Sequence, residues 1–182
     1  MEECISVFDM LKIGVGPSSS HTLGPWRAAE RFLEELRQDF DLNSITRVKV
    51  DLYGSLSLTG KGHATDLAVM LGLSGQDPEY IPVQDIDGII KAIENNHLIQ
   101  LGNEKALPFY ILQDIVFHKE FLPFHANGLT FTAFFENETE YASTFYSIGG
   151  GFVVKEERSN AKKKIAIKCA FPFPINNAAE LL

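Results

Sequence analysis

The sequence is short of cysteine and of positive charge. Its 182 residues include two cysteines, Cys4 and Cys169, too few for a disulfide framework or for a metal cluster held by cysteines alone. Lys and Arg number 16 against 24 Asp and Glu, which gives a formal net charge of −8. An acidic chain repels phosphate backbones, so nucleic acid is not expected as a partner.

Long apolar segments are also missing. No run approaches the roughly 18 apolar residues that a membrane helix needs, and no basic segment followed by an apolar one marks a signal peptide. The two cysteines are most simply reduced. We therefore expect a cytoplasmic protein without membrane contact. A hydrophobic content of 45% is typical of a globular chain, and 182 residues fit one domain.

What is present is a mainly helical first half and a β-rich second half. Apolar residues recur every three or four positions in the predicted helices, which span 23–40, 64–73 and 85–96, with Asp85 or Asp87 as a cap of the last. The predicted strands span 46–53, 113–118, 129–135, 140–147, 151–154 and 164–169, and a loop is expected at 54–63. This order favours an α+β fold with a mixed, largely antiparallel sheet over a doubly wound parallel sheet.

The first polar constellation is the serine loop, which we define as Ser18–Thr22, directly before the helix at 23–40. Backbone N–H groups and the positive end of the helix dipole would suit a carboxylate or phosphate there. Alternatively, Ser20 or Thr22 simply caps the helix, with Pro25 in its first turn. The residues alone leave both interpretations open.

A second constellation runs from Thr59 to Asp66. Its glycines allow close approach of a ligand, and His63 can accept a proton near neutral pH. Thr65 or Asp66 would cap the next helix or orient the imidazole. The alternative is a helix cap beside a surface histidine.

Two more segments stand out in the β-rich half. His125, in the segment 122–128, is either a second site group or an ordinary loop histidine. The run Gly149–Gly151 lies between predicted strands, where bare backbone costs chain entropy. A bulge, a tight bend, close docking of another domain or a simple linker would each explain it.

Three familiar chemistries lack their motifs. The serines are not in a Gly-x-Ser-x-Gly elbow, and sequence neighbours such as Ser20 and His21 rarely have the geometry of a hydrolase. His118 and His125 are seven residues apart, too far for the short ligand spacings of zinc sites. No glycine-rich loop opens a helix after a strand, as nucleotide binding would require.

Together the four segments resemble, in order and over nearly the whole chain, the N-terminal β domain of bacterial iron–sulfur L-serine dehydratases. One such segment alone would say little, but four in the family's order are specific. The matching segments are Ser6–Met10, Lys12–Thr22, Tyr53–His63, Thr65-Asp66, Leu122-Pro123, His125, Asn127-Gly128 and Tyr146–Gly151.

The resemblance implies dehydration of L-serine to aminoacrylate, which ends as pyruvate and ammonia. It implies a 4Fe–4S cluster, not pyridoxal phosphate, as the Lewis acid on the substrate hydroxyl, and a base that removes the α-proton. By the resemblance His63 is that base and His125 is a second active-site histidine of open role. The implied substrate-site residues are Ser18, Ser19, Ser20, His21, Thr22, Thr65 and Asp66.

The family's cluster cysteines lie in a second, mainly helical α domain, and Cys4 and Cys169 do not match them. We therefore expect residues 1–182 to be a β domain, truncated before that domain or forming one subunit of a split enzyme. It should bind no metal and be inactive alone. L-serine and the cluster-bearing domain are the expected partners, in a homo-oligomer of the full enzyme. The alternative is an L-serine-sensing regulatory module, suggested by the likeness to a substrate-binding domain of some phosphoglycerate dehydrogenases.

Overall fold

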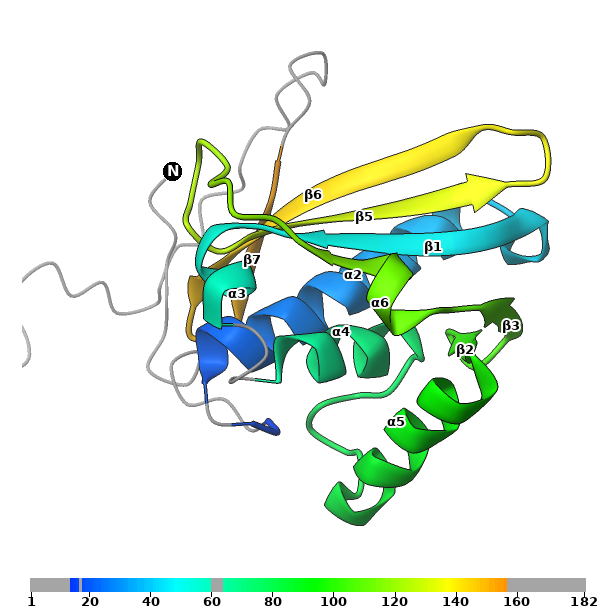
Figure 1. The fold of residues 1–182 in the computed structure, drawn as a ribbon, viewed down its shortest axis with the longest axis horizontal. Helices are drawn as coiled ribbons and strands as arrows, with labels where there is room; N and C mark the ends of the chain where they lie inside the picture. Colours follow the sequence, from blue (N-terminus) through cyan, green and yellow to red (C-terminus); the bar gives the residue numbers. More distant parts are fainter. Residues whose placement is uncertain (1–13, 17, 60–63, 157–182) are drawn as a thin grey trace, which may run out of the picture.

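The computed structural model of the chain describes residues 14–16, 18–59 and 64–156 (Figure 1). Its helical elements are η1 (Ser19–Leu23), α2 (Gly24–Asp39), η2 (Leu42–Ser44), α3 (Gly54–Thr59), α4 (Thr65–Leu73), α5 (Val83–Asn96) and α6 (Ile111–Asp114). Its strands are β1 (Ile45–Leu52), β2 (Leu98–Leu101), β3 (Lys105–Pro108), β4 (Ile115–Phe117), β5 (Gly128–Phe135), β6 (Glu140–Gly149) and β7 (Phe152–Lys155).

Five strands form the main sheet, in the order β4-β1-β5-β6-β7. β1 runs parallel to β4, and the other neighbouring pairs are antiparallel. The predicted α+β fold with a mixed, largely antiparallel sheet is therefore confirmed. β2 and β3 pair with each other in a separate two-stranded sheet.

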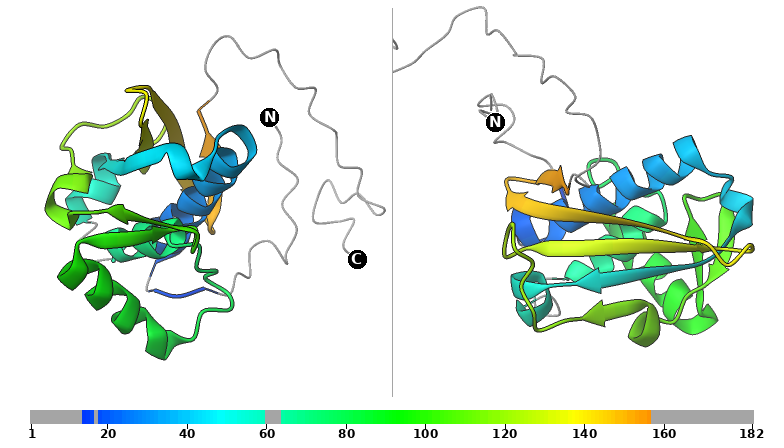
Figure 2. Two further views of the ribbon diagram at one scale, coloured as in Figure 1. Left: turned by 90° about the vertical axis from the view of Figure 1, so that its right-hand side faces the viewer. Right: turned by 90° about the horizontal axis from the view of Figure 1, so that it is seen from above.

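Helices cover one face of the main sheet. α2 packs directly against it, and the ring of Phe32 stacks on that of Phe131 in β5, with 5.1 Å between centroids. α5 lies beyond α4, on its side away from the sheet (Figure 1). The β2–β3 pair contacts α4 and α5 through β2 and strand β1 of the main sheet through β3. In the right-hand view of Figure 2 the strands lie in front of the helices, and none of the described helices covers that outer face. Every second side chain of β1 and β5 therefore faces the helices, which explains the alternation in their sequences.

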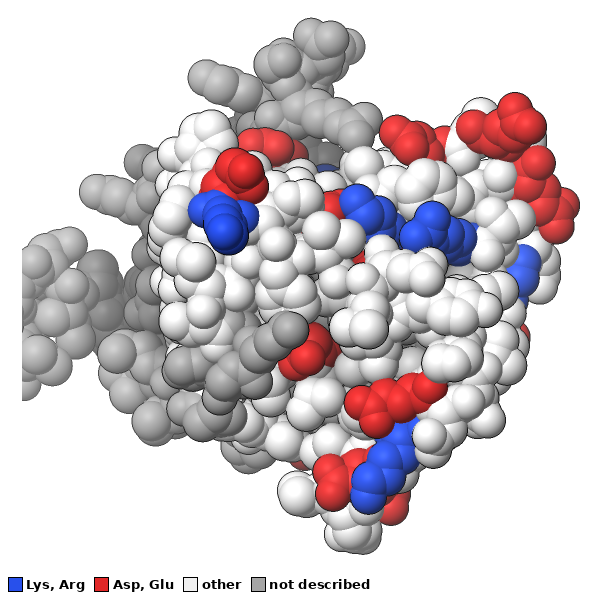
Figure 3. Space-filling model, viewed as in Figure 1, with Lys and Arg blue, Asp and Glu red and all other residues white. Residues whose placement is uncertain are grey.

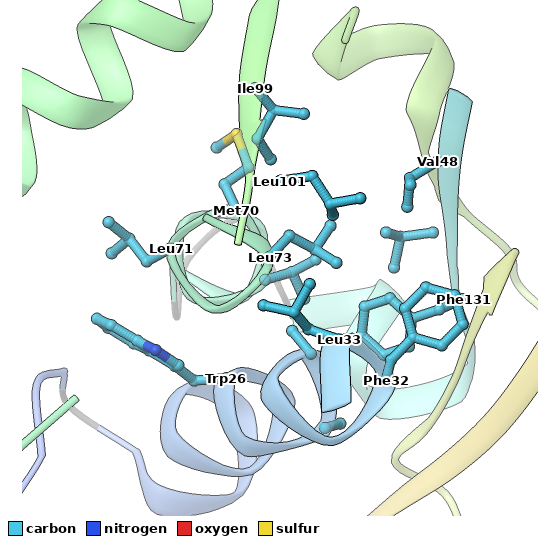
Figure 4. Packing of buried hydrophobic residues seen from close by; sticks show 14 of the residues in the cluster. Trp26, Phe32, Leu33, Val48, Met70, Leu71, Leu73, Ile99, Leu101 and Phe131 are labelled. Atoms are coloured by element: carbon cyan, nitrogen blue, oxygen red, sulfur yellow. The ribbon is translucent and has the colours of Figure 1, made fainter. Parts of the chain in front are cut away.

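The core surrounds α4, whose residues 68–73 are apolar and buried, so that this part of the helix is hydrophobic on all sides. In Figure 4 Met70 of α4 points toward Ile99 of β2, whereas Trp26 and Leu33 of α2 lie on the opposite side of α4. The Trp26 indole N–H donates to the Gln76 carbonyl at 2.7 Å, so its one polar atom is satisfied inside the core. None of the helices in the described ranges is long and apolar enough to cross a membrane.

The helices expected at 23–40, 64–73 and 85–96 are confirmed, as are the strands at 46–53, 129–135, 140–147 and 151–154. Residues 54–59 are helical where a loop was expected. The strand expected at 113–118 is partly wrong, because α6 occupies its beginning and only Ile115–Phe117 is extended. The strand expected at 164–169 lies outside the described residues.

Two local features differ from expectation for identifiable reasons. Neither Asp85 nor Asp87 caps α5, since Pro82 is its N-cap residue and no side chain makes a cap bond. The β2–β3 pair was not predicted, because each strand has only four residues. A segment that short carries little periodic signal.

Two helical glycines should respond oppositely to the same substitution. A Cβ on Gly72 of α4 would lie 2.7 Å from Ala29 Cβ and from the Trp26 carbonyl oxygen of α2, whereas one on Gly88 of α5 would meet nothing within 4 Å. We expect Gly72→Ala to lower the free energy of unfolding by about 2–3 kcal/mol through overpacking. Gly88→Ala should raise it by about 0.5–1 kcal/mol through helix propensity. Urea unfolding followed by circular dichroism measures both, and a neutral or stabilising Gly72→Ala would contradict this packing of α2 on α4.

Candidate functional site

The described parts of the four polar segments meet at one end of the main sheet. There β1 leads into α3, β5 begins and β6 ends, at the left in Figure 1. The backbone N–H of Ser55 donates to the Ala126 carbonyl at 2.9 Å, and that of Ser147 donates to the Asn127 carbonyl at 3.0 Å. Segments far apart in the sequence are thereby fixed beside one another.

The serine loop forms a wide turn of π-helical type, η1, rather than a capped helix start. The N–H of Gly24 donates to the carbonyl of Ser19, five residues earlier, and η1 continues directly into α2. No side chain makes a cap bond at the start of either element, so the expectation that Ser20 or Thr22 caps the helix is wrong. Thr22 is instead buried, whereas the Ser19 side chain is exposed.

Side chains of the loop form a chain of polar contacts that ends on α3. Ser18 Oγ lies 3.4 Å from Ser20 Oγ, and Ser20 Oγ lies 2.9 Å from His21 Nδ1. The other ring nitrogen, His21 Nε2, lies 3.0 Å from Ser55 Oγ. A hydroxyl both donates and accepts, so this pairing suits either neutral tautomer of the imidazole. His21 therefore links the serine loop to the first turn of α3.

The second polar segment contributes through the start of α4. Thr65 is fully buried, and its hydroxyl donates to the His21 carbonyl at 2.7 Å. The Asp66 carboxylate accepts the N–H of Leu67 at 3.0 Å in the first helical turn. His63 lies outside the described residues. The roles predicted for Thr65 and Asp66 in substrate binding stay predictions.

The His125 segment is tied to the end of β6. The Asn127 N–H donates to His125 Nδ1 at 3.1 Å, which requires that nitrogen to be unprotonated and puts the proton of the neutral ring on Nε2. Asn127 is buried, and its side-chain amide donates to the Ser147 carbonyl at 3.1 Å. The orientation of His125 is thus coupled to the position of β6.

Ser147 connects β6 to the serine loop. Its hydroxyl donates to the Ser20 carbonyl at 2.7 Å, and the residue is fully buried. Gly24 lies so close that a Cβ there would be 1.9 Å from Ser147 Oγ.

The glycine run follows Ser147 in the chain. Gly149–Gly151 all have positive φ, and the register of β6 with β7 shifts after Ser147. The glycine run is therefore a tight bend that starts at an irregularity of the bulge type, so two of the four explanations that its sequence left open apply.

Two tyrosines near this end of the sheet stay protonated at neutral pH. Burial raises the pKa of Tyr146 to about 12, with a further contribution from Glu156, whose carboxylate accepts the phenol O–H at 2.8 Å. Burial and the nearby Asp51 carboxylate also raise the pKa of Tyr53. Neither phenol is suited to act as a base, which leaves proton transfer to other groups.

The acidic charge of the chain is not concentrated at this end in the view of Figure 3. Red side chains gather instead at the opposite end of the sheet, over the β5–β6 turn. Glu136, Glu138 and Glu140 are exposed there. An anionic ligand at the serine loop would therefore not face this acidic group.

The structure adds three residues that were not singled out from the sequence. Each lies inside a motif that was recognised, but no spacing in the sequence shows that Ser55 and Ser147 meet the serine loop or that Asn127 bonds Ser147. Their hydrogen bonds join residues 20 to 127 positions apart. Because side chains alternate along a strand, the sequence does indicate that Ser147 of β6 points to the same face as Phe145. A serine at such an inward-facing position is the signal that could have identified it.

Comparison with known proteins shows similarity over nearly the whole chain. A model of the family described as serine dehydratase beta chain matches residues 6–158. An L-serine dehydratase of Haemophilus influenzae is 42% identical and L-serine dehydratase 1 of Escherichia coli is 44% identical, each over 98% of this chain and 39% of the relative. An L-serine dehydratase of Streptomyces coelicolor is 42% identical over 98% of this chain and 40% of its own length. The chain spans about two fifths of the length of these curated relatives.

Gly54 should be indispensable to the bend that brings α3 to the site. It has φ of +54°, and a Cβ there would lie 2.4 Å from the Ala126 carbonyl oxygen. We expect Gly54→Ala to lower the free energy of unfolding by about 2–4 kcal/mol through backbone strain and this clash. The control Ser57→Ala, in the same short helix, should change it by less than about 0.5 kcal/mol. Denaturant titration compares them, and equal midpoints would show that the bend tolerates a side chain.

Proposed function

Because the chain belongs to the serine dehydratase beta chain family, we propose that it is the β part of an L-serine dehydratase, which converts L-serine to pyruvate and ammonia. The observation that carries this proposal is the hydrogen-bonded network that joins the serine loop, the His125 segment and the end of β6. Convergent polar side chains of separate segments are what a substrate site needs.

In the proposed reaction, loss of the α-proton and of the β-hydroxyl converts L-serine to aminoacrylate and water. Aminoacrylate tautomerises to an imine, and water then hydrolyses it to pyruvate and ammonia. His63 is the proposed base for the α-proton, since an imidazole takes up a proton near neutral pH. The serine loop is proposed to bind the substrate carboxylate through its hydroxyls. Its contacts with His21 and Ser55 support this, because a site must be organised before the ligand arrives.

The chain contains two cysteines, Cys4 and Cys169, fewer than a 4Fe–4S cluster held by cysteines requires. We propose that a partner domain or subunit supplies the cluster ligands, and the length of the curated relatives, of which the chain matches 39%, leaves room for such a domain. A cytoplasmic location and a homo-oligomeric full enzyme stay predictions.

Replacing His63 tests the proposed base. In the complete enzyme with its cluster content verified, His63→Ala should lower kcat by about 10²–10⁴-fold, the usual contribution of a general base. His97→Asn is the matched control, because His97 ends α5 with φ of +52°, a conformation that Asn also adopts. Its kcat should stay within about twofold of the parent enzyme. Pyruvate formation is the measurement; unchanged turnover in His63→Ala would rule out this base, and no turnover of L-serine by the parent would rule out the proposed function.

Calorimetry separates an enzyme part from a serine sensor. Titration of this chain alone with L-serine should release no measurable heat of binding, since the proposed site is completed by the partner. Tight binding by the isolated chain would instead favour a regulatory module that senses L-serine.

A further inference from the structure

A proline creates a shortage of hydrogen-bond donors beneath the serine loop. Pro25 has no backbone N–H, so it cannot donate to the carbonyl of His21, four residues earlier, or to that of Ser20, five residues earlier. The N–H of Gly24 is already bonded to the Ser19 carbonyl. Residue 25 therefore cannot pair with either carbonyl, and donors from other elements are favoured there because unpaired backbone carbonyls inside a protein are costly.

Two side-chain hydroxyls supply those donors. Ser147 Oγ of β6 donates to the Ser20 carbonyl at 2.7 Å, and Thr65 Oγ1 of α4 donates to the His21 carbonyl, also at 2.7 Å. Both residues are fully buried, at 0% exposure. They belong to different elements, so the wide turn is held at adjacent carbonyls by the sheet and by a helix.

We propose that Ser147 and Thr65 are positioning residues, which hold the serine loop as a wide turn so that the Ser20 and His21 side chains are aligned with Ser55. The proposal rests on the proposed function, since the loop is the part of the site that would bind the substrate carboxylate. Without either hydroxyl a carbonyl of the turn loses that bond, and the turn can tighten or rotate. The side chains that it carries then move away from the positions that suit the substrate.

A second serine of β6 shows that the Ser147 contact is specific. Ser143 lies on the same strand and the same inward face, and is 3% exposed. Its hydroxyl has no hydrogen-bond partner within the described part of the chain. β6 thus tolerates a buried serine that bonds nothing, so burial alone does not account for the bond from Ser147 to the loop.

Kinetics of the complete enzyme test the proposal. Ser147→Ala and Thr65→Val each remove one hydroxyl with little change in volume, and should raise KM for L-serine about tenfold while kcat changes by less than about threefold. Ser143→Ala, which loses no such bond, should keep the parent KM. If the parent turns over L-serine and Ser147→Ala matches Ser143→Ala in KM, the positioning role is wrong.

Amide hydrogen exchange tests the same contact without any activity. In this chain alone, Ser147→Ala should speed exchange across Ser19–Leu23 about tenfold, and Ser143→Ala should not change it. If exchange is faster in Ser147→Ala but not in Ser143→Ala, the positioning role is supported, whether or not the parent enzyme uses L-serine. Failure of the parent to use L-serine counts against the proposed function. Equal exchange in the two variants overturns the proposal. If Ser147→Ala does not fold, judged by circular dichroism, Thr65→Val against Thr65→Ser decides the question by the same measurement.

Discussion

The missing N–H of Pro25 is the constraint from which the arrangement of the site follows. Proline costs little at the start of a helix when the carbonyls that its N–H would have reached find other donors. Here those carbonyls belong to Ser20 and His21, and they accept hydrogen bonds from hydroxyls of β6 and α4. The loop that carries the polar side chains is therefore fixed to the sheet on one side and to a buried helix on the other.

The positions of Thr65 and Ser147 beneath the loop depend on the packing of the core. α4 must keep Thr65 beneath the loop, and it does so because it is buried between α2 and β2, with Gly72 allowing the closest approach to α2. β6 must keep Ser147 beneath the loop, and its inward face is fixed by pairing with β5. Packing that looks remote from the site is thus responsible for the hydrogen bonds within it.

Much of this was accessible from the sequence, because periodicity is a local property. Alternation in 46–53 and 129–135 predicted β1 and β5, and the apolar spacing in 23–40 predicted α2. Short elements escaped for the same reason, since β2, β3 and α6 contain four residues each. The anion-site and capping interpretations of the serine loop were equally consistent with its residues, and the π-type turn removed the capping one.

The sequence by itself determined the fold class, the positions of the long elements and the segments that carry polar side chains. Tertiary structure decided how those segments meet. Ser147 and Ser20 are 127 positions apart, and Thr65 and His21 are 44 apart. Propensity and periodicity act over a few residues, whereas a hydroxyl and a carbonyl come within 2.7 Å only after the sheet and α4 have packed around a common core.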